Sequence, residues 1–304
     1  MPAASNRRDF FRTLIGGVAG FSLAQTSQTI KFAPLTDSIG LVTKAGGNIV
    51  VLSGGDGLLL VNGSLTEHSA DLMKFLGDQF KGQRISVAFN TDWHFEHTGS
   101  NEALRKAGAK IIAHENTKLW IGADFYSDWE KRTYKPRPPD ALPTDTFYTT
   151  GKMVFGEEPI EYGYMAQAHT DGDIYVFFPR QNVLVAGDVL SVGEYPILDY
   201  VTGGWIGGLQ NANQALLKIA NAETRIVPGT GAVQTRDDLQ VQADMCNAMR
   251  DRLVKLMRQG MGPQDMIAAA PSKEFDAKWG NPELFIKNAY RGMWGHVREL
   301  GNIV

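Results

Sequence analysis

The stretch NTDWHFEHTGSN, residues 90–101, follows directly after an apolar run, RISVAF, that predicts a short buried strand. It brings four potential metal ligands into six positions: Asp92, His94, Glu96 and His97. Where a loop leaves a strand end, residues two apart can point the same way, so several of these side chains can converge. Imidazole nitrogens and carboxylate oxygens are good ligands for zinc and other divalent first-row metals. The stretch therefore predicts a metal site at the end of a strand.

The segments on either side of this stretch have strand and helix patterns. Upstream, GNIVVLSGGDGLLLVNGS (47–64) predicts a hairpin of two buried strands that opens the domain, and SADLMKFLGDQF (69–80) predicts a helix. Downstream, SNEALRKAG (100–108) predicts a capped helix that ends at a glycine, and KIIAHE (110–115) predicts the next strand. The ligand-bearing stretch thus lies between a strand and a helix.

The second half of the chain returns to strand patterns after an irregular segment. Residues 119–147 are rich in aromatic residues and proline and predict a long ordered loop, either a lid or wall of a binding site or a packing element. Strand patterns follow in KMVFG, PIEYGYM, DIYVFFP, NVLVAGD and TRIVPG, with a helical pattern in LQNANQALLKIA before the last. From Thr235 onward the pattern is helical.

The composition fits a globular protein with a small-molecule partner. The chain has 304 residues, 43% of them hydrophobic, which is enough to bury a sizeable core. A formal net charge of -3, with scattered Lys and Arg residues, excludes the broad basic surface typical of nucleic-acid binding. The single cysteine, Cys246, cannot form an internal disulfide, and its helical surroundings favour a core residue over a reactive thiol.

The first 24 residues resemble a twin-arginine export signal. Arg7 and Arg8 are followed, after one residue, by two phenylalanines and then by an apolar, glycine-bearing run. Small residues at the end of this run place cleavage before Gln25. An amphipathic helix or a retained anchor is the alternative, but about eleven apolar residues are too few to span a bilayer. We therefore expect a signal over 1–24, export through the twin-arginine translocation machinery, and a mature domain over 25–304 in the periplasm or otherwise outside the cell, without stable membrane insertion.

Four stretches together resemble the metallo-β-lactamase superfamily. Counted from Thr91, the first is similar to its His-x-His-x-Asp-His motif, with Asp92 in place of the first histidine and Glu96 in place of the aspartate. AHTDGD then carries His169, and VLVAGD ends in Asp188, where members of the family supply a carboxylate that bridges two metals. The fourth stretch, VPGTG, has a threonine where the last histidine ligand would be.

The resemblance covers about residues 46–231 and implies an α/β fold, the four-layer αββα sandwich, with two neighbouring metal sites at one edge. The first site would have three ligands and an open position: Asp92, His94 and His169. The second would use Glu96, His97 and a share of Asp188. The second site is expected to be weaker, because the hydroxyl of Thr230 is a poor ligand. One or two zinc ions are expected, although the oxygen-rich set also admits manganese or iron.

The activity that the resemblance implies is metal-dependent hydrolysis of a small ester, lactone, thioester or amide by a metal-bound hydroxide. Asp188 or Glu96 would orient the water. Asp171 and Asp173 would either orient the imidazoles through hydrogen bonds or cap the turn before the next strand. Tyr195 would either line an apolar pocket or belong to the core.

Other interpretations stay open at this point. Asp92 and Glu96 could accept backbone hydrogen bonds and shape the loop instead of binding metal, and Thr230 could be a structural hydroxyl in a turn. The loss of two histidines admits a catalytically silent or weakly metallated protein that binds a ligand in the same place. A true β-lactamase is less favoured, because no feature of the sequence selects that substrate.

Overall fold

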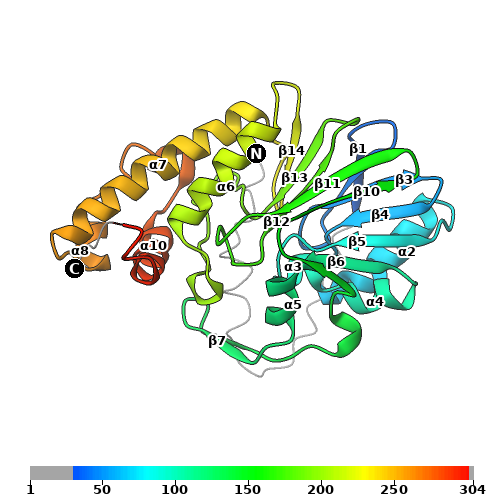
Figure 1. Cartoon of the computed structure of the whole chain (residues 1–304), viewed down its shortest axis with the longest axis horizontal. Helices are drawn as coiled ribbons and strands as arrows, with labels where there is room; N and C mark the ends of the chain where they lie inside the picture. The colour runs from blue at the N-terminus through cyan, green and yellow to red at the C-terminus, as the bar shows by residue number, and fades with distance from the viewer. Residues whose placement is uncertain (1–29, 301–304) are drawn as a thin grey trace, which may run out of the picture.

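Two runs of apolar strands build the two main β-sheets of the protein (Figure 1). The structure is a computed structural model that describes residues 30–300, so the expected export signal over 1–24 lies outside the described residues. Within residues 30–300, no helix is long and apolar enough to cross a membrane.

The first sheet contains seven strands in the order β1-β2-β3-β4-β5-β6-β9. Their bounds are β1 (Lys31–Pro34), β2 (Ile39–Thr43), β3 (Ile49–Gly54), β4 (Gly57–Val61), β5 (Ile85–Phe89), β6 (Lys110–His114) and β9 (Asp145–Phe147). The predicted hairpin of β3 and β4 is present, but β1 and β2 precede it, so it does not open the domain. From β4 to β9 the neighbours are parallel, which brings the carboxyl ends of β4, β5, β6 and β9 to one edge.

The second sheet contains five strands in chain order. Their bounds are β10 (Thr150–Phe155), β11 (Glu158–Tyr164), β12 (Ile174–Phe178), β13 (Val183–Gly187) and β14 (Arg225–Pro228). The strands from β10 to β13 are antiparallel, and β14 pairs with β13 in parallel after a helical crossover. The carboxyl ends of β13 and β14, the strands predicted in NVLVAGD and TRIVPG, therefore lie together.

Three apolar clusters arrange these elements in four layers. The cluster between the sheets takes side chains from both, including the fully buried Phe89 of β5 and Phe178 of β12. The outer face of the first sheet packs against α2 (Ser69–Gln79) and α4 (Asn101–Lys106). The outer face of the second sheet packs against the helices of the second half (Figure 1). The expected order of helix, sheet, sheet and helix is confirmed.

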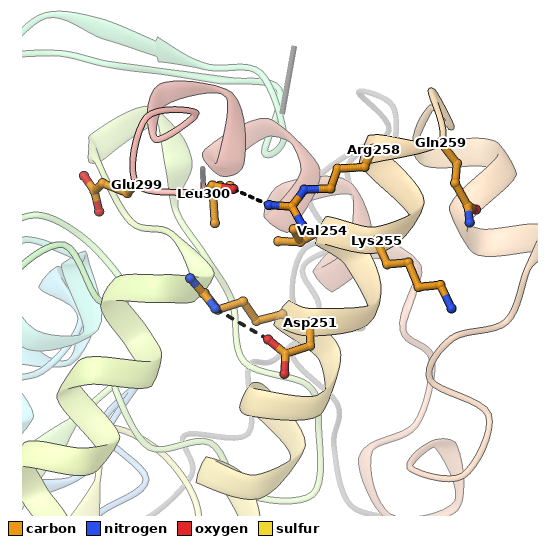
Figure 2. A pocket seen from close by; sticks show the side chains of 8 residues that line it. Asp251, Val254, Lys255, Arg258, Gln259, Glu299 and Leu300 are labelled. Carbon is orange, nitrogen blue, oxygen red and sulfur yellow. Dashed lines mark hydrogen bonds and ion pairs between the residues drawn. The ribbon is translucent and has the colours of Figure 1, made fainter. Parts of the chain in front are cut away.

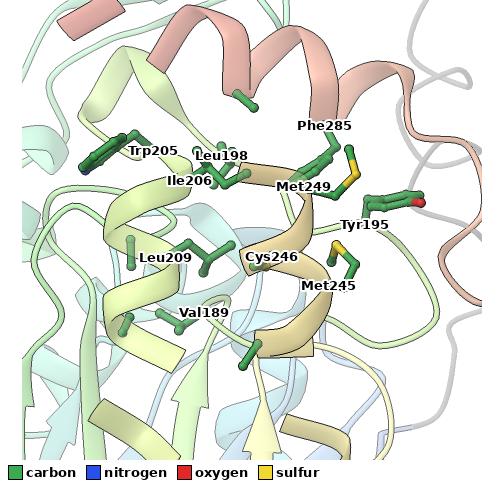
Figure 3. Close-up of a cluster of buried hydrophobic side chains, with 14 of the residues drawn as sticks. Val189, Tyr195, Leu198, Trp205, Ile206, Leu209, Met245, Cys246, Met249 and Phe285 are labelled. Atoms are coloured by element: carbon green, nitrogen blue, oxygen red, sulfur yellow. The ribbon is translucent and has the colours of Figure 1, made fainter. Parts of the chain in front are cut away.

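The helices of the second half share a large apolar cluster (Figure 3). They are α6 (Ile206–Ile219), α7 (Arg236–Arg258), α8 (Pro263–Ala268), α9 (Asp276–Trp279) and α10 (Glu283–Gly295). A reciprocal pair of hydrogen bonds between Thr235 and Asp238 starts α7, which explains why the helical pattern begins there. Cys246 is fully buried in this cluster, and burial raises the pKa of its thiol to about 12, as expected for a core residue.

The segment predicted to be one long loop contains more structure than its sequence indicates. After α5 (Glu115–Ile121), a hairpin forms from β7 (Phe125–Ser127) and β8 (Arg132–Tyr134), and a 3-10 turn, η2 (Pro139–Ala141), precedes β9. Phe125 and Tyr134 stack across the hairpin, with ring centroids 5.1 Å apart, and both pack against Trp93. Strands of three residues carry too little periodicity to be recognised, and aromatic packing stabilises this hairpin instead.

Phe178→Ala tests the core between the sheets. Because the ring is fully buried between the two sheets, its removal should lower the free energy of unfolding by about 3–5 kcal/mol in urea titrations. Val154→Ala on β10, where the side chain is 65% exposed, is the matched control. This substitution should change the free energy of unfolding by less than about 0.5 kcal/mol. Equal effects of the two substitutions would contradict the layered arrangement.

Candidate metal centre

The loop after β5 is fixed at its start by buried amide side chains. Thr91 donates its backbone N–H to Oδ1 of Asn62, at the end of β4, over 2.9 Å. The carbonyl of Thr91 accepts the backbone N–H of Ile174, at the start of β12, over 2.8 Å. Asn90 donates from Nδ2 to the carbonyl of His97. The loop is therefore tied to both sheets, at the edge where the parallel strands end.

A single helical turn then directs the histidines inward. His94 precedes α3 (Phe95–Thr98), and its backbone N–H donates to Oδ1 of Asp92 over 2.8 Å. Asp92 thus shapes the loop, as one interpretation of the sequence held, while its carboxylate also faces the histidine rings. His97, inside α3, is fully buried.

The first group of potential ligands joins the loop to the segment before β12. One ligand atom each from Asp92, His94 and His169 lies within 4.8 Å of the others, and all three side chains are buried. Nδ1 of His94 is 3.1 Å from Oδ1 of Asp92, and the rings of His94 and His169 lie 4.7 Å apart. These are the three residues that the resemblance assigned to the first site.

The second group lies beside the first and includes Asp92 as well. Nε2 of His97 is 3.4 Å from Oδ2 of Asp92 and 3.5 Å from Oδ2 of Asp188, at the end of β13. The same oxygen of Asp188 is 3.9 Å from Nε2 of His169. Asp188 therefore faces both groups, while Asp92 belongs to both.

Glu96 is the residue whose place differs from the expected ligand set. It is half-buried and belongs to neither group of converging ligand atoms, whereas Asp92 belongs to the second group in addition to the first. Neighbouring residues of a helix point about 100° apart, so the inward direction of His97 turns Glu96 aside.

Buried nitrogen atoms without hydrogen-bond partners indicate that these residues fit a cation. Both ring nitrogens of His97 and Nδ1 of His169 are buried and have no hydrogen-bond partner among the described residues. Such groups are costly in a folded protein unless something satisfies them. Imidazole and carboxylate together are a typical ligand set for zinc and related divalent ions, so a bound cation would satisfy them.

The carboxylates also change the proton affinity of the histidines. Burial lowers the pKa of His97, but Asp92 and Asp188 outweigh it and raise the value to about 9. For His169, burial acts in the same way, and Asp173 and Asp188 raise the pKa to about 10. The carboxylates therefore favour positive charge in this cluster, which a bound cation would supply.

The two aspartates after His169 have different surroundings. Asp173 accepts hydrogen bonds from the backbone N–H and the hydroxyl of Thr170, and its Oδ1 is 3.5 Å from Nδ1 of His169. It thus caps the turn and faces the imidazole from behind. Asp171 accepts a hydrogen bond from Nε1 of Trp120 over 2.6 Å, and burial raises its pKa to about 6.

The turn after β14 comes very close to the centre through a residue that the sequence did not single out. A Cβ atom on Gly229 would overlap with the carboxylate of Asp188 and lie 3.0 Å from Cε1 of His97. Asn48 fixes this turn by donating its backbone N–H to the carbonyl of Gly229 and its amide to the carbonyl of Pro228. Thr230 is half-buried in the turn and belongs to neither ligand group.

Tyr195 lies in the helical core and not in the centre. Its hydroxyl donates to Oδ1 of Asp276 over 2.8 Å, and its ring stacks on Phe285 of α10. The side chain therefore contributes to the packing of the second-half helices (Figure 3). Of the two roles considered for Tyr195, lining an apolar pocket or belonging to the core, the structure supports the core role.

A hollow elsewhere on the surface takes no part in this centre. It lies between the end of α7 and residues 299–300 (Figure 2). Three of its charged side chains have local partners: Arg258 donates to the carbonyl of Leu300 over 2.8 Å, and Arg250 pairs with Asp251 at 3.5 Å. None of the candidate ligands lines it.

Comparisons with known proteins agree with this architecture. The family model of the metallo-beta-lactamase superfamily matches residues 42–231. A metallo-beta-lactamase type 2 from Bacillus sp. (strain 170) is 24% identical over 67% of this chain and 77% of its own length, and one from Bacillus cereus is 23% identical over 68% and 79%. The solved structure of a metallo-beta-lactamase from Pontibacter korlensis, 17% identical, covers 72% of this chain and 99% of its own with a TM-score of 0.60. The expected fold is thereby confirmed.

Without metal, the protein should become less stable as the pH rises from about 7 to 10. The folded pKa values of His97 and His169, about 9 and about 10, exceed the unfolded value of 6.5. The folded state thus holds extra protons, and the stabilisation is complete below pH 6.5 and lost as the pH passes through 9 and 10. Urea unfolding of EDTA-treated protein measures this, and His169→Gln should flatten the slope. A stability that rises over this range would contradict the assignment.

Proposed function

The chain belongs to the metallo-beta-lactamase superfamily, and on that premise we propose that it is a metal-dependent hydrolase of small esters, lactones, thioesters or amides. The observation that carries the proposal is the pair of buried ligand groups that share Asp92. Such an arrangement has no obvious purpose in packing, because buried carboxylates and unpartnered imidazoles are unfavourable without a cation.

Asp92, His94 and His169 would hold the first cation. Zinc fits two imidazoles and a carboxylate best, and manganese or iron is the alternative for so oxygen-rich a centre. A bound divalent cation lowers the pKa of water and polarises a carbonyl group. Asp92, His97 and Asp188 would hold a second ion if one binds.

Asp188 is the residue that we assign to orienting the attacking water. Its Oδ2 lies 3.5 Å from His97 and 3.9 Å from His169, and the residue is 7% exposed, more than His97, His169 or Asp92. It therefore borders the side from which water and substrate arrive and can accept a proton there. Glu96, the other candidate for this role, acts on His94 and His97 through its charge. We assign it to electrostatic support.

A catalytically silent or weakly metallated protein is the second candidate. It is favoured by Thr230, which lies in the turn against the centre and brings no imidazole to it. The similarity to proteins named metallo-beta-lactamase type 2 makes β-lactam hydrolysis a third possibility to test alongside simple esters.

Metal content separates these candidates. The folded protein should carry at least about one equivalent of metal by elemental analysis after loading with zinc and desalting. His94→Ala and His169→Ala should each lower bound metal and ester hydrolysis at least about tenfold, because each removes a ligand of the first group. His68→Ala, which changes a half-buried histidine outside both groups, is the matched control. Less than about a tenth of an equivalent after loading would sink the hydrolase proposal and favour a silent protein.

We further propose that the protein is exported folded, through the twin-arginine machinery, to the periplasm. The support is the Arg7–Arg8 pair and the apolar run behind it. Replacing both arginines by lysine should leave the precursor in the cytoplasm, as measured by cell fractionation and the mass of the mature chain. Changing Lys31 and Lys44 to arginine is the matched control and should leave export intact. Normal export of the lysine pair variant would contradict the proposal.

A further inference from the structure

His94 lies between two buried carboxylates, of which only Asp92 belongs to the ligand groups. Nε2 of His94, the nitrogen on the side away from Asp92, is 3.8 Å from Oδ2 of Asp199. His94 and Asp188 are each 7% exposed, whereas Asp92, His97 and His169 are at most 1% exposed. His94 and Asp188 are therefore the candidate ligands nearest to solvent, and Asp199 lies beside His94. No pattern in the sequence pointed to Asp199, because it lies in an irregular segment outside the motifs.

Asp199 is held in place by two side-chain hydrogen bonds. It is fully buried just before η3 (Tyr200–Thr202), where its Oδ1 accepts a hydrogen bond from Nε1 of Trp129 over 2.9 Å. Its Oδ2 accepts a hydrogen bond from the hydroxyl of Thr202 over 2.6 Å. Both donors are neutral, so they orient the carboxylate without cancelling its charge. From behind, Asn288 of α10 donates to the carbonyl of Leu198 and fixes the backbone.

Glu130 adds a second acid on the same side. It comes from the turn between β7 and β8, next to Trp129, and its carboxylate accepts a hydrogen bond from the hydroxyl of Tyr134 over 3.0 Å. The ring of Tyr134 packs on Trp93, with centroids 4.8 Å apart, and Trp93 stacks on His94 at 4.1 Å, so Glu130 lies on the same side of the centre as Asp199. The hairpin β7–β8, which was not predicted from the sequence, therefore brings two residues to the side of the centre where His94 lies. They are Glu130 and Trp129, the hydrogen-bond partner of Asp199.

The negative charge of this region exceeds what bound cations would neutralise. Six carboxylates lie around the three histidines: Asp92, Glu96, Glu130, Asp173, Asp188 and Asp199. Two divalent ions would leave a net negative charge on this set of carboxylates, and a single ion would leave a larger one. An excess of one sign of charge attracts ions of the opposite sign and repels those of the same sign.

We propose that Asp199 and Glu130 make the centre select substrates that are neutral or positively charged near the scissile carbonyl over substrates that carry a carboxylate there. The inference rests on the proposed function, since it names the charge class of the substrate for the same centre. The partly exposed rings of Phe95, Trp120 and Phe125, which pack around the buried Trp93 beside His94, suit an organic cation or an apolar group. β-Lactam antibiotics, whose ring system carries a carboxylate, belong to the disfavoured class.

Three aryl esters with the same leaving group test this selection on the zinc-loaded mature protein. Their acyl chains end in a trimethylammonium, a tert-butyl or a carboxylate group, so that size is matched and charge differs. We expect kcat/KM to fall in that order, with the anionic ester at least about tenfold below the neutral one. Added salt should narrow the difference between the two charged esters. Equal kcat/KM values for the three esters would overturn the proposal.

Asp199→Asn and Glu130→Gln assign the selection to these two residues. Each change removes one negative charge and keeps the shape, so each should raise the anion-to-cation ratio of kcat/KM by about three- to tenfold. Glu157→Gln and Asp37→Asn remove exposed acids in the β10–β11 and β1–β2 turns, at the opposite edge of the sheets, and should leave the ratio unchanged. If Asp199→Asn fails to fold, Glu130→Gln decides alone, and an unchanged ratio in it overturns the assignment.

Binding of the corresponding methyl ketones separates this proposal from the hydrolase proposal. If no ester is hydrolysed, the hydrolase proposal falls, and calorimetric titration of the three ketones decides the charge selection. Tighter binding of the cationic ketone than of the anionic one supports the selection even then. Equal binding, or no binding of any ketone, overturns it.

Discussion

The buried carboxylate of Asp92 is the interaction on which the centre depends. One oxygen accepts the backbone N–H of His94 and lies 3.1 Å from its ring, and the other lies 3.4 Å from His97. A single side chain thus sets the direction of the loop and the separation of the two ligand groups. A neutral imidazole at this position could not hold two positive partners together, so the exchange of histidine for aspartate gives the centre an anion at its middle.

The fold supplies the remaining constraints by bringing strand ends together. Parallel pairing of β4 with β5 and of β13 with β14 places the ligand loop, Asp188 and the Gly229 turn along one edge of the two sheets. The absence of a side chain at Gly229 permits the turn to lie against Asp188 and His97. The turn of the hairpin β7–β8 binds Asp199 through Trp129, and α10 binds the adjacent carbonyl of Leu198, so elements outside the ligand motifs position the acid beside His94.

The sequence was sufficient to predict those parts of this arrangement that depend on local residue patterns. The long apolar strands and helices, and the convergence of Asp92, His94 and His169, followed from periodicity and from the resemblance. Glu96 and Tyr195 were placed less well, because the direction of a side chain within one helical turn or an irregular segment depends on packing that the sequence does not display. Asp199 could not be found at all, since its place depends on a contact with Trp129, 70 residues away in the chain. Glu130 was missed because it lies in a hairpin of three-residue strands, β7 and β8, which carry too little periodicity to be recognised.

A crystal structure of the zinc-loaded protein, with anomalous diffraction measured on both sides of the zinc absorption edge, tests the central claim most directly. The account predicts an anomalous peak from a zinc ion that is bound by Asp92, His94 and His169. A second ion would give a weaker peak beside His97 and Asp188. The absence of a peak among these side chains, or a peak only at surface residues, would contradict it.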